Sequence, residues 1–217
     1  MAIIVKTSFS TPSLSIIEKA VNVIENEGLV VGITDTVYGI FTNALCSHCV
    51  DRVFEVKERE GKPIPVLVSS IKHVIDAADE ISDEVLCLLK YMWPGPVTLI
   101  IPVKKDFFPY RVHLGRNKVG FRIPAAPLPR LLAEKIGGYL TGTSANISGK
   151  PSPRHVFEAI KQLGDRIDLY IDSGIAPIGL PSTVIEIVGD EIKVIREGSI
   201  STNVITMAWR YCCEKCR

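Results

Sequence analysis

The order of its segments constrains the fold of this chain more than any single motif does, because amphipathic helical stretches alternate with short apolar runs. From Ser13 to Gly28, apolar residues recur at helical spacing, with Ser15 and Glu18 in the register of a capping box. The run LVVGI from Leu29 lies between turn residues, which is typical of a strand buried on both faces. The sequence therefore predicts an α/β fold.

The same alternation continues along the chain. We expect further helices at 49–57, 71–78, 82–92, 127–137 and 152–164, and further strands at 65–69, 97–103, 118–124, 138–144 and 168–174. Residues 182–198 alternate across Gly189-Asp190, which predicts a tight hairpin. Since crossover helices join parallel strands and a hairpin joins antiparallel ones, we expect a twisted, mixed parallel and antiparallel sheet flanked by helices.

Length and composition indicate one globular domain spanning 1–217. The chain is 47% hydrophobic and has no low-complexity linker or internal repeat. Lys+Arg 25 against Asp+Glu 24 gives a net charge of +1, so any anion site must be local. No signal-peptide pattern opens the sequence, and no apolar run approaches the ~20 residues of a membrane helix. We therefore expect a cytoplasmic protein without a membrane contact.

Six cysteines include two C-x-x-C pairs, Cys46/Cys49 and Cys213/Cys216. Four thiolates at this spacing suit a structural zinc ion, and each pair also suits a disulfide. The first pair equally fits the start of a helix and the second a peripheral tail. The sequence leaves these alternatives open, and we assign no metal ligand to the functional site.

Four polar clusters interrupt the apolar scaffold near predicted strand ends, where open sheets place ligands. The first is TDTVYG at 34–39, which offers hydroxyls and amides to a small polar ligand, although a capped strand-to-helix turn has the same composition. The second holds Lys57, Arg59 and Lys62 in one short turn. Cations kept so close favour a polyphosphate, while cations at a helix end are also an ordinary response to the helix dipole.

The third cluster lies in the strand KVGFRIP. In a strand, Lys118, Gly120 and Arg122 face the same side, so two cations flank a bare stretch of backbone. A charge within so apolar a strand is costly to bury without a partner. An anionic ligand, most simply a carboxylate for Arg122, satisfies this requirement, and an internal salt bridge is the alternative.

The fourth cluster is the loop GTSANISGKPSP, which starts at Gly142. It follows a predicted strand and precedes a helix expected near Pro153, and this arrangement receives anions. The same composition also fits a turn that only caps the helix. Its polar side chains are Thr143, Ser144, Asn146, Ser148, Lys150 and Ser152.

Together the clusters indicate a pocket for a nucleotide and a small carboxylic acid. Cations would hold phosphates, an arginine would hold the carboxylate, and hydroxyls would contact other polar atoms. The sequence contains no H-E-x-x-H helix, G-x-S-x-G elbow or Rossmann glycine set. These motifs would have supported zinc hydrolysis, serine-hydrolase chemistry or hydride transfer.

Seven motifs in order give the chain a resemblance to a known family. They are TDTVYG, K-x-R at Lys57 and Arg59, WPGPVT at Trp93, FRIP at Arg122, S-x-N at Ser144 and Asn146, PSTV at Pro181 and IREG at Arg196. In these residues the chain resembles the YrdC/YciO family of threonylcarbamoyl-AMP synthases, in its short single-domain form. The resemblance extends over about 16–198 and leaves 199–217 as a tail that is apolar enough to form a helix.

The resemblance implies a reaction and a cavity. L-Threonine, bicarbonate and ATP would give threonylcarbamoyl-AMP and pyrophosphate, a nucleotidyltransferase reaction, with Mg2+ bound to the ATP. Partner proteins would then pass the threonylcarbamoyl group to the adenosine beside the anticodon of tRNA. The fold implied is an open α/β fold with a deep basic cavity.

Site residues follow from the resemblance position by position. Lys57 and Arg59 are expected to be the catalytic cations that face the phosphates. The threonine would contact Thr36, Leu67, Arg122, Gly142 and Ser182. The ATP would contact Arg59, Lys62, Lys118, Ser144, Asn146, Ser152 and Arg196.

Two positions depart from the family pattern, and two other functions stay open. Ile33 stands where family members often have a proline, and Leu67 stands where they often have a histidine that reaches the threonine. The alternatives are a YciO-like protein that binds double-stranded RNA in the cavity, and an enzyme that makes a different carbamoyl-adenylate. Against the RNA alternative, the net charge is near zero and aromatic residues are not interleaved with Lys and Arg.

Overall fold

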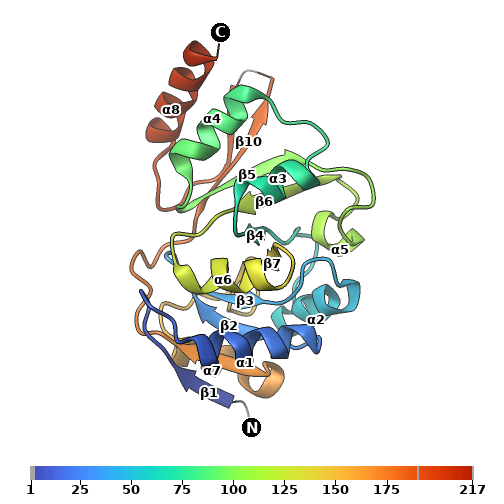
Figure 1. Ribbon diagram of the computed structural model, residues 1–217, viewed down its shortest axis with the longest axis vertical. Coiled ribbons are helices and arrows are strands. Elements are labelled where there is room, and N and C mark those ends of the chain that lie inside the picture. The colour runs from blue at the N-terminus through green and yellow to red at the C-terminus, as the bar shows by residue number, and fades with distance from the viewer. Residues whose placement is uncertain (1–2, 190, 217) are drawn as a thin grey trace.

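The strands form two mixed sheets, which lie one above the other in Figure 1. The computed structural model describes residues 3–189 and 191–216. Both sheets contain parallel and antiparallel pairs, so the predicted mixed α/β class is confirmed. We expected one sheet, and the structure divides the strands between two because the chain changes sheets within the predicted strand 138–144.

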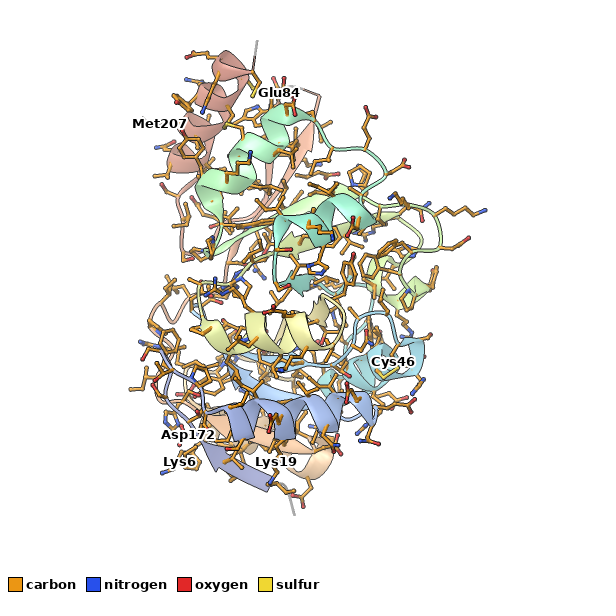
Figure 2. All side chains as sticks on the ribbon, viewed as in Figure 1. Lys6, Lys19, Cys46, Glu84, Asp172 and Met207 are labelled. Atoms are coloured by element: carbon orange, nitrogen blue, oxygen red, sulfur yellow. A yellow bond between two sulfur atoms is a disulfide. The ribbon has the colours of Figure 1, made fainter. Side chains whose placement is uncertain are left out.

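The first sheet has the strand order β1-β9-β2-β3-β8. Its strands are β1 (Ile3–Lys6), β2 (Val30–Ile33), β3 (Tyr38–Phe41), β8 (Thr143–Ser144) and β9 (Leu169–Asp172). The central strands β2 and β3 are fully buried and pair antiparallel, whereas β9 runs parallel to both β1 and β2. Lys6 pairs with Asp172 at the end of β1, and both are labelled in Figure 2.

The second sheet has the order β11-β10-β5-β6-β4-β7. Its strands are β4 (Val66–Val68), β5 (Val97–Pro102), β6 (Lys118–Arg122), β7 (Tyr139–Thr141), β10 (Thr183–Val188) and β11 (Glu191–Arg196). The antiparallel pairing of β10 with β11 confirms the predicted hairpin. Asp190, which we placed in its turn, lies outside the described residues.

Helices cover these sheets (Figure 1). They are α1 (Leu14–Glu25), α2 (Ser47–Lys57), α3 (Ile71–Ala77), α4 (Asp83–Met92), α5 (Tyr110–His113), α6 (Pro127–Lys135), α7 (Val156–Leu163) and α8 (Thr202–Lys215). A single 3₁₀ turn, Gly164–Arg166, follows α7. Among residues 3–189 and 191–216, no helix combines the length and apolarity needed to cross a bilayer.

Two details of the predicted helix starts are wrong, namely the capping box of α1 and the first residue of α7. The helix α1 begins at Leu14 with Ser13 as its N-cap, so Ser15 and Glu18 lie inside the helix and form no capping box. The helix expected from residue 152 begins only at Val156. The preceding His155 is its N-cap, and the ring Nδ1 accepts a hydrogen bond from Phe157 N at 3.4 Å.

The segment TDTVYG forms the turn of a hairpin between β2 and β3, rather than a strand-to-helix turn. Thr34 Oγ1 accepts hydrogen bonds from the backbone N–H of Thr36 at 3.1 Å and of Val37 at 3.2 Å. The hydroxyl therefore satisfies turn donors that would otherwise be buried without acceptors. This fixes Thr36 at the end of the buried strand pair.

The C-terminal helix α8 packs beside α4, away from the gap between the sheets (Figure 1). Its inward face carries the buried residues Ile205, Trp209 and Cys212. A disulfide joins Cys212 to Cys87 of α4. Cys213 and Cys216 do not form a disulfide with each other, so the second C-x-x-C motif is not a disulfide. Cys46 and Cys49 are bonded to each other and not to either of them.

We predict that Ile205→Ala lowers the free energy of unfolding by about 2–5 kcal/mol, because Ile205 is fully buried on the inward face of α8 and truncation leaves a cavity. The matched control is Met207→Ala on the same helix. Met207 is 71% exposed and points outward in Figure 2, so we expect a change below about 0.5 kcal/mol. Urea unfolding measures both, and equal losses would contradict the packing of α8.

Candidate functional site

A cavity of about 520 Å³ lies between the two sheets. Residues from β3 and β8 of the first sheet line one side, and residues from β4, β5, β6, β10 and β11 of the second sheet line the other. The cationic lining residues are Arg59, Lys62, Arg116, Arg122 and Arg196. Among the described residues, no Asp or Glu lines it, which makes the cavity locally basic in a chain of near-zero net charge.

Arg122 is the most buried of these cations and is held on three sides. Its Nε donates to Gly95 O at 3.0 Å, and Nη1 donates to Thr36 Oγ1 at 2.9 Å. Nη2 pairs with Asp35 Oδ1. The internal salt bridge that the sequence left open is therefore present. A guanidinium has five N–H donors, so two remain without a partner in the described part of the chain.

Arg59 and Arg196 are fixed by carbonyl groups rather than by carboxylates. Arg59 donates from Nε to Lys62 O at 2.9 Å and from Nη2 to Pro63 O at 2.6 Å. Arg196 Nη2 donates to Ser182 O at 2.8 Å. Carbonyl dipoles orient these guanidiniums without neutralising them, so both charges act on the cavity.

Burial is the main cause that lowers the pKa values of these arginines, and repulsion by Arg196 adds to it at Arg59 and Arg122. Burial, with a contribution from Arg196, lowers the pKa of Arg59 to about 10. Burial also lowers the pKa of Arg122, an effect that Asp35 opposes and Arg196 reinforces. The pKa of Arg196 is lowered by burial as well. A polyanion in the cavity would relieve this repulsion.

Lys57 does not face the cavity, although the sequence placed it against the phosphates. It is 1% exposed, and its ammonium donates to Ser144 O and, at 2.7 Å, to Asn146 O. Burial, with a contribution from Arg59, lowers its pKa from 10.5 to about 7. Lys57 therefore stabilises the loop that carries Ser144, through its backbone carbonyls and from the side away from the cavity.

The floor of the cavity requires a glycine at position 142. Gly142 N donates to Pro65 O at 2.7 Å, and a Cβ on Gly142 would lie 2.7 Å from Leu67 Cγ. Leu67 pairs with Arg122 across β4 and β6, so an apolar side chain lies beside the buried guanidinium. The chain can pass this closely only because position 142 has no side chain.

Most predicted site residues do line the cavity. They are Thr36, Arg59, Lys62, Leu67, Arg122, Gly142, Ser144, Ser182 and Arg196. Ser182 Oγ lies 2.9 Å from Thr98 Oγ1, which places two hydroxyls together on the second sheet. The residues that the resemblance implied come from six separate segments of the chain, and the fold brings them to one cavity.

Other predicted residues lie outside the lining. Lys118 Nζ pairs with Glu186 Oε1 at 2.6 Å, because β6 and β10 both flank β5 and bring the two side chains together. Asn146 turns its amide toward Ile147 O and Lys150 O, both at 2.8 Å, and stabilises its own loop. Ser152 lies in the same loop, and α7 contributes no residue to the lining.

Sequence reasoning missed Arg116 and Thr98. Arg116 precedes β6 in a loop with no recognisable pattern, so no signal marked it. Thr98 had a signal, since it is a polar residue within the apolar strand VTLIIPV. Its place two residues before Ile100 puts both side chains on the cavity face of β5.

The arrangement can bind anions and orient them, but the described lining residues include no carboxylate that could bind a metal ion. Hard cations such as Mg2+ prefer oxygen ligands and often enter bound to phosphates. A phosphate-bound ion is compatible with the hydroxyls of the lining, and no lining residue is assigned to it. The chemistry available is electrostatic stabilisation by fixed cations rather than nucleophilic attack by a side chain.

Comparisons with known proteins identify the family. The model of the Sua5/YciO/YrdC family, which carries the description "Telomere recombination", matches residues 22–198. A protein of Bacillus subtilis named threonylcarbamoyl-AMP synthase is 34% identical over 202 residues, which are 93% of this chain and 58% of that protein. The chain belongs to the Sua5/YciO/YrdC family.

Two further relatives support this assignment. A protein of Methanocaldococcus jannaschii is 39% identical over 176 residues, which are 81% of this chain and 82% of that protein. The crystal structure of Pyrococcus abyssi Sua5 complexed with L-threonine superposes with a TM-score of 0.90 at 32% identity, covering 95% of this chain and 61% of that one. The chain therefore spans about three-fifths of the Bacillus and Pyrococcus proteins.

We predict that the buried Lys57 makes stability depend on pH. The pKa of Lys57 is about 7 in the folded protein, whereas the unfolded chain has the ordinary value of 10.5. Between pH 7 and pH 10.5 the folded state therefore releases a proton that the unfolded state keeps. The free energy of unfolding of the native chain, relative to Lys57→Met, should then rise by about 2 kcal/mol from pH 7 to pH 9. Urea titrations at both pH values measure this difference, and parallel curves for the two proteins would contradict it.

Proposed function

We propose that this protein forms threonylcarbamoyl-AMP and pyrophosphate from L-threonine, bicarbonate and ATP. The observation that carries the proposal is a cavity which, in the described part of the chain, has five cationic lining residues, no lining carboxylate and a buried arginine with spare donors. The name of the Bacillus relative and the threonine complex of Pyrococcus Sua5 support the same activity. The product would serve threonylcarbamoyladenosine modification of tRNA beside the anticodon, through partner proteins.

The threonine would lie against Arg122 at the buried end of the cavity. Two N–H groups of Arg122 have no partner among the described residues and suit a carboxylate, and Thr36 and Asp35 keep the guanidinium plane fixed. The paired hydroxyls of Thr98 and Ser182 offer acceptors and donors to the polar atoms of the amino acid. Leu67 offers only an apolar contact at the position where family members often have a histidine.

The phosphates of ATP would lie near Arg59 and Arg196, whose charges are not neutralised by acidic side chains. Lys62 and Arg116 extend the same positive lining. ATP would enter with Mg2+ bound to its phosphates, where the ion would offset part of their negative charge. Ser144 would contact the nucleotide from the first sheet, held in place by Lys57 behind it.

Catalysis in this proposal is a matter of positioning and charge. Threonine and bicarbonate first give a carbamate and water. The carbamate oxygen then attacks the α-phosphate of ATP while pyrophosphate leaves. Negative charge develops on the phosphoryl oxygens, and fixed guanidiniums stabilise it without reorganising. Holding the carbamate and the α-phosphate together removes much of the entropic cost of the encounter.

The experiment follows pyrophosphate release from ATP and bicarbonate with each amino acid in turn. We expect release to depend on L-threonine and on bicarbonate, because both supply atoms of the product. Pyrophosphate release that depends on a different amino acid would indicate that the cavity beside Leu67 makes another carbamoyl-adenylate. Absence of any amino-acid-dependent release would contradict the proposed synthesis, and salt-sensitive binding of an RNA stem without turnover would favour the RNA alternative.

We predict that Arg122→Lys raises the KM for threonine by at least about tenfold, because lysine keeps the charge opposite Asp35 but loses the planar fork. Lysine is preferable to alanine here, since alanine would leave a buried Asp35 unpaired at a cost of about 3–5 kcal/mol. The matched control is Arg210→Lys on the exposed face of α8. An unchanged KM in the Arg122 variant would remove that residue from the threonine site.

A further inference from the structure

The motif CSHC at the start of α2 has a chemistry that the proposed synthesis does not use. A disulfide joins Cys46 to Cys49, and His48 lies between them in the sequence. Figure 2 shows Cys46 at the periphery of the molecule, and neither cysteine lines the cavity. The pair is therefore chemically separate from the site described above.

The two sulfurs differ in their access to solvent. Cys46 is half-buried and its neighbours Ser47 and His48 are exposed, whereas Cys49 is only 1% exposed. Leu45, next to Cys46, is also 41% exposed. Thiol–disulfide exchange requires an attacking thiolate to reach one sulfur in line with the bond, so attack is directed to Cys46.

The surroundings of Cys46 stabilise negative charge on its sulfur. Cys46 is the N-cap of α2, and Cys49 N donates to Cys46 Sγ at 3.4 Å. Both ring nitrogens of His48 lie 3.6 Å from Cys46 Sγ, and Nε2 lies 3.9 Å from Cys49 Sγ. A helix N-terminus and an adjacent imidazole are the features that favour a thiolate in reactive cysteines.

We propose that Cys46 and Cys49 form a thiol–disulfide exchange site whose reductant is a dithiol. A thiolate of the dithiol attacks Cys46 Sγ, the Cys46–Cys49 bond breaks, and the electron pair leaves on Cys49 Sγ. The second thiolate of the reductant then attacks the reductant's own sulfur in this mixed disulfide and releases Cys46 as a thiolate. The reductant becomes a disulfide, and the two cysteines gain two electrons and two protons in total.

A metal site is the competing use of the same residues. The ligand atoms of Cys46, His48 and Cys49 lie within 4.8 Å of one another, a spacing that would suit zinc. Zinc binds thiolates, and in the structure the two sulfurs are bonded to each other. The structure thus favours exchange, and the experiment must tell the two apart.

The experiment traps the mixed disulfide. Reduced Cys49→Ser protein is mixed with oxidised glutathione, and peptide mass spectrometry follows each cysteine over time. We expect Cys46 to form a stable mixed disulfide about tenfold faster than Cys216, an exposed thiol outside both disulfides that serves as the control in the same chain. The wild-type protein should instead regenerate the Cys46–Cys49 disulfide and release glutathione.

The second variant tests the direction of attack. In Cys46→Ser, the buried Cys49 should react about tenfold more slowly than Cys46 does in Cys49→Ser. Reaction of Cys46 no faster than Cys216 would overturn the proposal. Stoichiometric zinc that survives dialysis of the reduced wild-type protein and blocks its reaction with glutathione would also overturn it, in favour of a metal site.

Discussion

The close approach of two chain segments at Gly142 is the constraint on which the rest of the site depends. Strand β7 belongs to the second sheet and β8 to the first, and Gly142 alone separates them. A side chain there would meet Leu67 and the carbonyl of Pro65. Because Gly142 has no Cβ, the chain can pass from the second sheet to the first at this point. Ser144 of the first sheet and Arg122 of the second therefore line the same cavity.

The cavity keeps a net positive charge because Arg59 and Arg196 are held by neutral groups. Arg59 and Arg196 donate to backbone carbonyls, and within residues 3–189 and 191–216 Arg122 is the one lining arginine with an acidic partner. Carbonyl dipoles stabilise the geometry of a guanidinium but leave its net charge, so the free protein keeps like charges close together. A bound polyphosphate would supply the missing negative charge, which connects the structure of the cavity to adenylate chemistry.

Much of the fold could be predicted, and most of the residues expected in the site do line the cavity, whereas the misplaced ones have local causes. Apolar periodicity located the helices and strands, and motif order brought Arg59, Arg122 and Arg196 to one cavity. The division into two sheets was missed because residues 139–144 contain no Pro, Asn or Asp, so no turn signal marks the change of sheet at Gly142. Lys118 was misplaced because its partner Glu186 lies on a strand far along the chain. The burial of Lys57 was missed because its carbonyl partners lie in a distant loop.

The most direct measurement of the central claim identifies the product itself. The protein is incubated with ATP, L-threonine and carbon-13-labelled bicarbonate, and the adenylate is analysed by mass spectrometry. The account predicts threonylcarbamoyl-AMP that carries the label in its carbamoyl carbon, formed by the native protein and lost in Arg59→Ala. An unlabelled adenylate, or the same labelled yield from Arg59→Ala, would contradict a cavity that joins a carbamate to the α-phosphate through its cations.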